Sequence, residues 1–369
     1  MKAVGIVFSN IHDKEIKELT ALRTLASVPF GGRFRLIDFV LSNMVNSGIS
    51  KVGVITKRNY QSLMDHIGSG KSWDLSRKRG GLIVLPPYGV SGTTLYQSRF
   101  EAIKNTEAFL RRSDEDYVVM SDCDNVCNFD FSRATDFHIE KNADITVVYR
   151  KKDIAAAERK PRTAFTLDGG RRVIKVENSD RMSGKKLVYT NMLIVDRRFL
   201  LSIVESAEEN GFKSFSSDIL TRTSDFRIYG YELEGYFASI DGVSNYYKHS
   251  MELLRPENRA ALFKPDASIY TKVRDSAPCR LEASARVSDS LIADGCVIEG
   301  EVTGSILFRG VRVEKGAKIE NSIIFQDTYV GADSRLNCVI ADKQARILAN
   351  RTLSGHETQP YFIAKGSII

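Results

Sequence analysis

Short apolar runs alternate with helical patterns from residue 1 to about residue 240. Five short runs rich in apolar residues have the pattern of buried β-strands: Ala3–Phe8, Lys51–Thr56, Tyr117–Ser121, Asp144–Tyr149 and Val188–Val195. Between the first two runs, Leu36–Val45 has apolar residues on one helical face, and Gly48 follows as a helix stop. Strands that alternate with helices predict an α/β domain with a mostly parallel, Rossmann-like sheet, which binds ligands at the carboxyl ends of its strands.

A second helical pattern runs through Phe100, Ile103 and Leu110. Thr94 and Gln97 precede it with the spacing of a capping box, in which side chains satisfy the first free N–H groups of a helix.

The periodicity changes after about Pro265. Aliphatic and aromatic residues recur there at intervals of five or six, at Val313, Ile319, Phe325, Val330 and Leu336, with glycines between them. This hexapeptide period is typical of a left-handed parallel β-helix, in which each of these residues points into a triangular coil. A small β-sandwich of short strands is the alternative. We therefore expect an α/β domain at residues 1–250, a helix and linker at 251–265, and a β-helix domain at 266–369.

The composition of the chain argues against several classes of function. Lys plus Arg exceeds Asp plus Glu by 53 to 46, but the basic residues are scattered and no aromatic residues interleave with them, which argues against nucleic-acid binding. The five cysteines form no C-x-x-C pair, as expected of reduced thiols in the cytosol. No apolar run has the length of a membrane span, so we expect no membrane association and a cytoplasmic protein.

One segment carries a specific resemblance. Residues 28–43 read VPFGGRFRLIDFVLSN, and residues 46–49 read NSGI. This segment resembles the FGG-(K/R)-(F/Y)-R-(I/L)-IDF-x-LSN … NSGI motif of bacterial glucose-1-phosphate adenylyltransferases, which make ADP-glucose for glycogen synthesis. The resemblance implies a nucleotidyltransferase domain followed by a β-helix. It also implies a reaction in which a sugar phosphate attacks ATP, and that reaction requires positioning and charge neutralisation.

Several catalytic elements of that family are missing. Active members follow the first strand with G-G-x-G-T-R, whose amides and arginine hold phosphates. Here residues 9–16 read SNIHDKEI, without glycine, and Asp13 and Glu15 add negative charge. We expect this loop to have become a helix start, with His12 on the surface. The family's R-A-K-P lysine corresponds to Leu25, its G-T-A-D to residues 92–95, and its E-K pair to Glu177 and Asn178.

The metal site is half present by the same resemblance. Asp124 corresponds to the first metal-binding aspartate of the family, whereas Ser239 stands at the second. Asp122 and Asp124 could form a replacement pair if the strand extends far enough to place both on one face. Alternatively, they terminate the strand and satisfy nearby N–H groups. Asp124 is therefore a vestige of the catalytic set, and this chain is expected to require no cofactor, with Mg²⁺ needed by a catalytic partner.

A chain that keeps the fold of an enzyme family but lacks several of its catalytic residues suggests a regulatory role. The resemblance extends to the D-type subunits of the family, which pair with a catalytic subunit in a heterotetramer. It places effector-type, anion-binding arginines at Arg23 and Arg35. We expect both near the β-helix, able to bind a phosphorylated metabolite, phosphate or sulfate. Salt bridges are the alternative role for them. The β-helix is expected to contribute to subunit contacts.

Three other functions are weighed against this one. The chain could be an active adenylyltransferase that uses the Asp122/Asp124 pair. It could be a hexapeptide acyltransferase, although the one C-terminal histidine, His356, lies beyond the regular repeats. It could also be a structural component of a translation-factor exchange complex, which the segment at 28–43 argues against.

Overall fold

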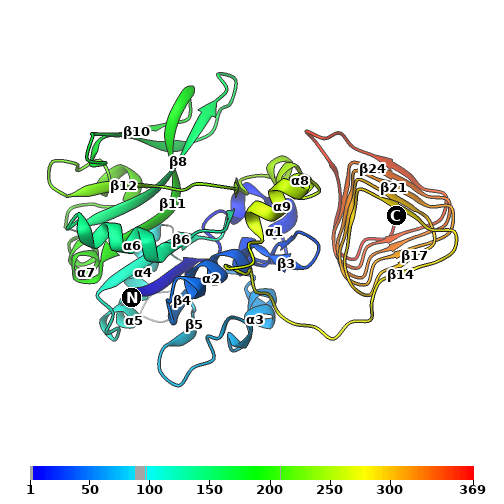
Figure 1. The fold of residues 1–369 in the computed structure, drawn as a ribbon, viewed down its shortest axis with the longest axis horizontal. Helices are drawn as coiled ribbons and strands as arrows, with labels where there is room; N and C mark the ends of the chain where they lie inside the picture. Colours follow the sequence, from blue (N-terminus) through cyan, green and yellow to red (C-terminus); the bar gives the residue numbers. More distant parts are fainter. Residues whose placement is uncertain (1–2, 88–95, 97, 208) are drawn as a thin grey trace.

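The computed structural model describes residues 3–87, 96, 98–207 and 209–369. An α/β domain built around one large sheet is followed by a triangular β-helix (Figure 1). The predicted fold class, a nucleotidyltransferase-type α/β domain before a hexapeptide β-helix, is confirmed. Among the helices of the described ranges, none is long and apolar enough to cross a bilayer.

The central sheet has the strand order β10-β9-β11-β6-β1-β4-β5, with β8 beside β11 and β12 beside β8. Its strands are β1 (Ala3–Phe8), β4 (Lys51–Ile55), β5 (Gly81–Leu85), β6 (Tyr117–Asp122), β8 (Ile145–Ile154), β9 (Arg162–Leu167), β10 (Val173–Ser179), β11 (Gly184–Asp196) and β12 (Ile228–Glu232). The five predicted strands correspond to β1, β4, β6, β8 and β11. Strands β6, β1, β4 and β5 are parallel, whereas β11 is antiparallel to β6, which the sequence did not indicate.

Helices cover both faces of this sheet, with one apolar cluster under each layer. One layer contains α4 (Arg99–Asn105), α5 (Glu107–Arg111) and α7 (Arg197–Ser206), and the other contains α2 (Leu36–Asn46), α3 (Gln61–Ile67) and α6 (Phe131–Glu140). Helix α2 agrees with its predicted stripe. The helix predicted through Leu110 is divided at Thr106, and Ser98 caps α4 by accepting the Glu101 N–H at 3.2 Å. The predicted capping pair, Thr94 and Gln97, lies outside the described residues.

The remaining elements before the β-helix are short. They are α1 (Lys17–Thr20), β2 (Pro29–Phe30), β3 (Phe34–Arg35), β7 (Asn125–Cys127), β13 (Phe237–Ser239), α8 (Val243–Glu252) and α9 (Pro256–Leu262), with 3-10 turns at Asp13–Glu15, Leu25–Ser27 and Lys71–Trp73 and a π-helical turn at Phe215–Ile219. Helix α8 begins before the segment 251–265, where a helix and linker are expected. Helix α9 lies inside the segment expected to be a linker, so the connection is more ordered than its polar sequence suggests.

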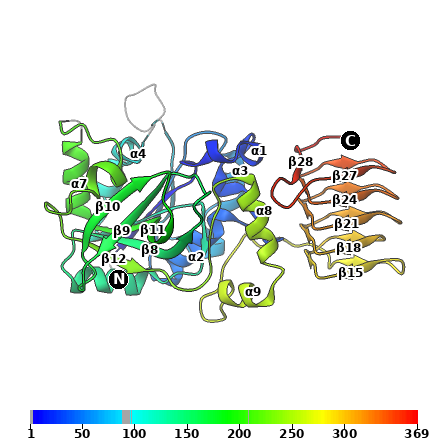
Figure 2. The same ribbon diagram turned by 90° about the horizontal axis from the view of Figure 1, so that it is seen from above.

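The β-helix consists of three parallel five-stranded sheets, and each coil adds one strand to each sheet (Figure 2). The first contains β14 (Arg280–Leu281), β17 (Val297–Ile298), β20 (Arg312–Val313), β23 (Tyr329–Val330) and β26 (Arg346–Ile347). The second contains β15 (Arg286–Ser288), β18 (Glu301–Thr303), β21 (Lys318–Glu320), β24 (Arg335–Asn337) and β27 (Thr352–Ser354). The third contains β16 (Leu291–Ile292), β19 (Ile306–Leu307), β22 (Ile323–Ile324), β25 (Val339–Ala341) and β28 (Tyr361–Ile363).

The hexapeptide residues are not all inside the coil. Val313, Ile319, Val330 and Leu336 belong to the apolar cluster in the interior, as predicted. The prediction for Phe325 is wrong, because this ring belongs to the cluster shared with the α/β domain. Side chains alternate along β22, so Ile324 fills the interior and its neighbours face outward.

An apolar core joins the two domains. It combines Phe308 and Phe325 of the β-helix with Tyr246 of α8 and Phe30 of β2. The Phe325 ring lies 5.0 Å from the Phe308 ring and 6.2 Å from the Tyr246 ring, both edge-to-face. The Tyr246 hydroxyl donates to the Pro29 carbonyl at 2.6 Å. This core fixes how the domains sit against each other.

Phe325→Ala should lower the free energy of unfolding by about 3 kcal/mol, because it removes a fully buried aromatic ring from a core with little room to relax. Urea unfolding followed by circular dichroism measures the change. Tyr361→Ala, at a half-exposed ring of the same domain, is the control and should change stability by less than about 1 kcal/mol. Equal losses in the two variants would contradict a junction core.

Candidate functional site

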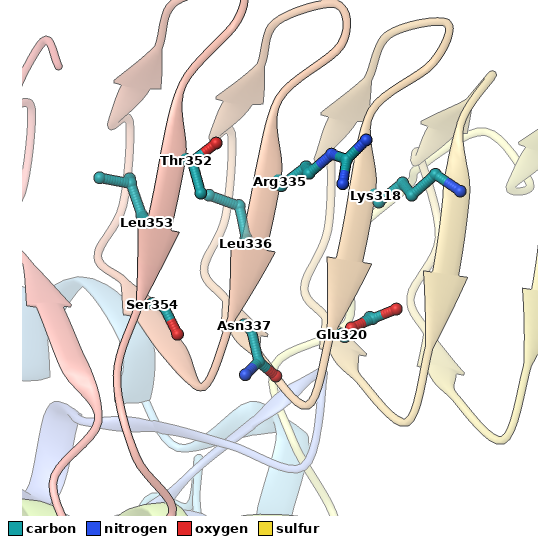
Figure 3. A pocket seen from close by; sticks show the side chains of 8 residues that line it. All are labelled: Lys318, Glu320, Arg335, Leu336, Asn337, Thr352, Leu353 and Ser354. Atoms are coloured by element: carbon teal, nitrogen blue, oxygen red, sulfur yellow. The ribbon is translucent and has the colours of Figure 1, made fainter.

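A cleft of about 1910 Å³ lies where β1 and β6 end. Residues from the loop after β1, from the start of α4 and from the turn after β6 line one side, and basic residues such as Arg150 and Lys248 line the other. A second, smaller hollow of about 230 Å³ lies over β21, β24 and β27 of the β-helix (Figure 3). The lining of that hollow contains Lys318, Arg335 and Glu320 but no histidine or cysteine, so the large cleft is the candidate site.

The loop after β1 is closed by its own hydrogen bonds. The Ser9 hydroxyl donates to the Ile55 carbonyl at 2.7 Å, and the Asp13 carboxylate accepts the Leu25 N–H at 2.8 Å. The turn at Asp13–Glu15 and helix α1 follow, in agreement with the helix start predicted there. The Leu25 side chain is buried in the junction core. The loop therefore has no glycine that would let phosphates approach its amides closely, and Leu25 supplies no cation at the position of the family's lysine.

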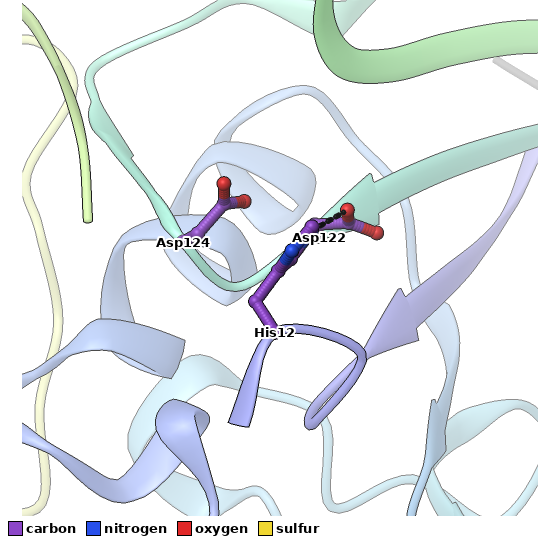
Figure 4. A group of neighbouring side chains, drawn as sticks. All are labelled: His12, Asp122 and Asp124. Atoms are coloured by element: carbon purple, nitrogen blue, oxygen red, sulfur yellow. Dashed lines mark hydrogen bonds and ion pairs between the residues drawn. The ribbon is translucent and has the colours of Figure 1, made fainter. Parts of the chain in front are cut away.

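His12 is drawn into the site and does not lie on the surface, so that prediction is wrong. Its Nε2 lies 2.8 Å from Asp122 Oδ2, and its Nδ1 lies 2.9 Å from Glu15 Oε1 (Figure 4). Its side chain is 17% exposed. Burial lowers the pKa of His12, but the negative charges of Asp124 and Asp122 outweigh burial and raise it well above its ordinary value.

Arg99 neutralises Asp122. Its Nε donates to Asp122 Oδ1 at 3.3 Å and its Nη2 donates to Oδ2. Asp122 is almost fully buried, which raises its pKa, but Arg99 and His12 outweigh burial and hold that pKa below its ordinary value. The sequence analysis missed Arg99. Arg99 directly follows Ser98, the residue that caps α4. This position at the start of a helix, beside the strand ends, is the feature of the sequence that could have identified it.

Asp124 lies in the turn after β6, which ends at Asp122. The strand therefore does not extend to both residues, yet the turn still brings them together. One ligand atom from each of His12, Asp122 and Asp124 lies within 4.8 Å of the others. Asp124 Oδ2 accepts from the Ser239 hydroxyl at 3.3 Å, while its Oδ1 is buried without a hydrogen-bond partner. Burial, reinforced by Asp122, raises the pKa of Asp124 to about 7.

The residues do not fit the magnesium site that the resemblance implies. That arrangement needs a second carboxylate at position 239, where this chain has a serine that donates a hydrogen bond to Asp124. The sugar-phosphate position is also changed, because Asn178 bonds to the Ser216 carbonyl at 3.1 Å and Glu177 pairs with Lys186 at 2.7 Å. The segment at 92–95 lies outside the described residues.

Arg23 crosses the junction between the two domains. Its Nη2 lies 2.9 Å from both carboxylate oxygens of Asp342, which directly follows β25. The guanidinium is buried, and its Nη1 has no hydrogen-bond partner. Arg23 is therefore only partly paired.

Arg35 stands at the start of α2, where it bonds to the Ser62 carbonyl and, at 3.0 Å, to the Ser62 hydroxyl. Burial, with repulsion from Arg274 and Arg23, lowers the pKa of Arg35 to about 10. Burial and repulsion from Arg35 and Arg23 lower the pKa of Lys343 to about 7. Arg274 and Lys343 thus join the two predicted arginines in one cationic cluster. The sequence analysis missed both, because they come from distant coils and loops.

Comparisons with known proteins agree with this architecture. Residues 14–160 match the nucleotidyl transferase family, and residues 277–359 match the GlmU-like, C-terminal hexapeptide family. The chain is 35% identical to the glycogen biosynthesis protein GlgD of Bacillus subtilis over 99% of this chain and 96% of that protein. It is 32% identical to the glucose-1-phosphate adenylyltransferases of Bacillus thuringiensis and Bacillus cereus, over 89% of this chain and of each enzyme.

Asp13→Asn should flatten the pH dependence of stability. Burial raises the pKa of Asp13 from 3.8 to about 7, so the folded chain holds a proton there that the unfolded chain has released. The stability that this proton provides is complete below about pH 4 and is lost as the pH rises through 7. Between pH 5 and pH 8 the wild type should lose about 1 to 2 kcal/mol more than the variant in urea unfolding. Asp114→Asn, at an exposed carboxylate, is the control. An equal loss of stability between pH 5 and pH 8 in the wild type and in Asp13→Asn would contradict the raised pKa of Asp13.

Proposed function

The chain belongs to the glucose-1-phosphate adenylyltransferase family, and we propose that it is a non-catalytic or barely active regulatory subunit of it. In this role it modulates ADP-glucose synthesis for glycogen biosynthesis in the cytoplasm by pairing with a catalytic relative in a heterotetramer. It needs no cofactor itself, and Mg²⁺ is required by the catalytic partner. The proposal rests on one observation: His12, in the loop after β1, bonds to Asp122 at the position where the corresponding loop of active relatives is expected to hold the nucleotide.

The cleft opposes ATP at the place where phosphates would have to bind. Adenylyl transfer accumulates negative charge, which an enzyme stabilises with amides, cations and metal ions. Here Glu15, Asp122 and Asp124 surround His12, and Arg99 is already engaged with Asp122. Loss of one preorganised charge stabiliser commonly costs roughly a hundred- to a thousandfold in rate. With the cradle, the lysine and one carboxylate absent, turnover should be negligible.

The cationic cluster at the junction supports an effector site. Arg23, Arg35, Arg274 and Lys343 repel one another, and the partnerless Nη1 of Arg23 leaves a buried donor available. A phosphate or sulfate group of a metabolite would satisfy that donor and reduce the repulsion. Because residues of both domains contribute, bound anion would also strengthen the junction.

The first coil of the β-helix supports a subunit contact. Leu281 and Val287 begin two interior columns but are 56% and 36% exposed, whereas the next residues in those columns, Ile298 and Val302, are fully buried. Stacked repeats normally hide such ends. Among the described residues nothing covers this end, and its triangular shape fits the end of another β-helix.

The second candidate is an active adenylyltransferase that uses Asp122 and Asp124. The convergence of the two carboxylates favours it. The ion pair between Arg99 and Asp122 and the serine at position 239 disfavour it.

An activity assay separates these functions. With ATP, glucose 1-phosphate and Mg²⁺, the isolated chain should release no pyrophosphate above background, and on mixing it should change the response of a catalytic relative to phosphorylated effectors. Leu281→Glu should weaken that effect by placing a charge in the apolar contact, while Leu348→Glu, at the opposite end of the coil, is the control. Turnover by the isolated chain at the rate of its catalytic relatives would overturn the regulatory assignment.

Sulfate binding tests the junction. Sulfate keeps its charge between pH 6 and pH 8, whereas Lys343, with a pKa of about 7, is protonated at the lower pH. A bound anion favours the protonated amine, so calorimetry should find up to about tenfold weaker binding at pH 8 than at pH 6.

Lys343→Ala should weaken sulfate binding at pH 6 and remove this pH dependence, and Arg35→Ala should weaken binding at both pH values. Lys315→Ala, at an exposed lysine of the same domain, should leave the affinity unchanged. Sulfate binding that is insensitive to both Lys343→Ala and Arg35→Ala would remove the cluster as the effector site.

A further inference from the structure

We propose that His12, Asp122 and Asp124 form a binding site for one divalent transition-metal ion, such as Mn²⁺, Co²⁺ or Zn²⁺. The site differs in its residues from the two-carboxylate magnesium site that the resemblance implies, because it replaces the carboxylate at position 239 with an imidazole from the loop after β1. It does not depend on the regulatory role proposed above.

The three side chains already converge. One ligand atom from each of His12, Asp122 and Asp124 lies within 4.8 Å of the others, and the His12 ring points toward Asp122 (Figure 4). A metal ion at about 2.0 to 2.2 Å from nitrogen and oxygen ligands holds them roughly 3 to 4 Å apart. A side-chain movement of about an ångström therefore suffices for coordination. His12 and Asp124 also line the large cleft, which gives an ion a path from solvent.

Asp124 supplies an independent indication of a ligand site. The residue is only 3% exposed, and its Oδ1 has no hydrogen-bond partner. An unpaired, buried carboxylate oxygen is costly, and in proteins such groups are usually paired or bound to metal. Ser239 bonds only to Oδ2, which leaves Oδ1 available as a ligand atom.

Each ligand is also held by an outer partner. His12 Nδ1–H donates to Glu15 Oε1 at 2.9 Å, so that Nε2 is the nitrogen presented to the site. Arg99 fixes Asp122, and Ser239 fixes Asp124. Metal-binding histidines characteristically bond through their other nitrogen to a carboxylate, and ligating carboxylates are themselves hydrogen-bonded. The arrangement has this pattern for all three residues.

The charges match a divalent cation. With His12 neutral, as a metal ligand requires, Glu15, Asp122 and Asp124 carry three negative charges when ionised. Arg99 contributes one positive charge, which leaves an excess of two. An imidazole ligand favours Mn²⁺, Co²⁺ or Zn²⁺ over Mg²⁺, which prefers oxygen ligands and retains its water.

The test uses the full-length chain after treatment with a chelator. Titration with Co²⁺, followed by its visible absorption, should show one ion per chain with a nitrogen-containing coordination spectrum, and Mn²⁺ and Zn²⁺ should compete for it. Millimolar Mg²⁺ should not displace it. His12→Gln and Asp124→Asn should each weaken Co²⁺ binding at least tenfold. His356→Gln, at an exposed histidine, and Asp114→Asn are matched controls and should bind as the wild type does.

Asp124→Asn is nearly isosteric, so it tests the site even if His12→Gln disturbs the loop, and circular dichroism checks that each variant is folded. The proposal is overturned if the folded wild type binds no Co²⁺ at millimolar concentration. It is equally overturned if Asp124→Asn binds Co²⁺ as tightly as the wild type. Because the readout is metal binding, either result leaves the regulatory assignment to be decided by the activity assay.

Discussion

The ion pair between Arg23 and Asp342 sets the charge balance of the junction whose apolar core fixes the arrangement of the two domains, because both of its partners are buried there. A buried ion pair is stabilising only if its partners' remaining hydrogen-bonding groups are also satisfied. Here Asp342 pairs with Arg23, which retains a donor without a partner, and Asp38 and Asp65 offset part of the repulsion that Arg35 receives from Arg23 and Arg274. The rings of Phe325 and Tyr246 pack the two domains together around these charges. The junction thus combines a packed apolar core with a buried, incompletely paired arginine, the feature on which the proposed anion site depends.

The part of the cleft around His12 has the opposite imbalance. There Glu15, Asp122 and Asp124 outnumber Arg99, and burial, reinforced by Asp122, raises the pKa of Asp124. A nucleotide triphosphate would add more negative charge to this place, whereas a cation would reduce the excess. Basic residues such as Arg150 and Lys248 line the cleft farther along the chain, so the acidic excess is confined to the strand ends.

The sequence predicted those features that depend on local patterns. Strand β1 agrees with its apolar run because all six of its residues are buried, and helix α2 agrees with its apolar stripe, although polar residues between the stripe positions are buried as well. The prediction for Phe325 was wrong because a hexapeptide period defines the coils but does not distinguish a residue that fills the interior from one that packs on another domain. The candidate site was likewise predicted only in part. Asp122, Asp124 and Arg23 follow from a motif, whereas His12 and Arg99 gain their roles only from contacts across more than twenty residues of chain.

A single segment connects the two sites. His12 stands near its beginning in the cleft, and Arg23 stands near its end at the junction, with helix α1 between them. The Asp13 carboxylate bonds to the Leu25 N–H at 2.8 Å, and the Thr20 hydroxyl bonds to the Asp13 carbonyl at 2.7 Å, so the segment is closed on itself. A charge bound at either end acts on the same short, cross-linked unit. In active relatives this loop is expected to hold phosphates. In this chain the two hydrogen bonds of Asp13 cross-link it between the cleft and the junction, and a contiguous segment of this kind is what the proposed regulatory role requires if an anion at the junction is to act on the cleft.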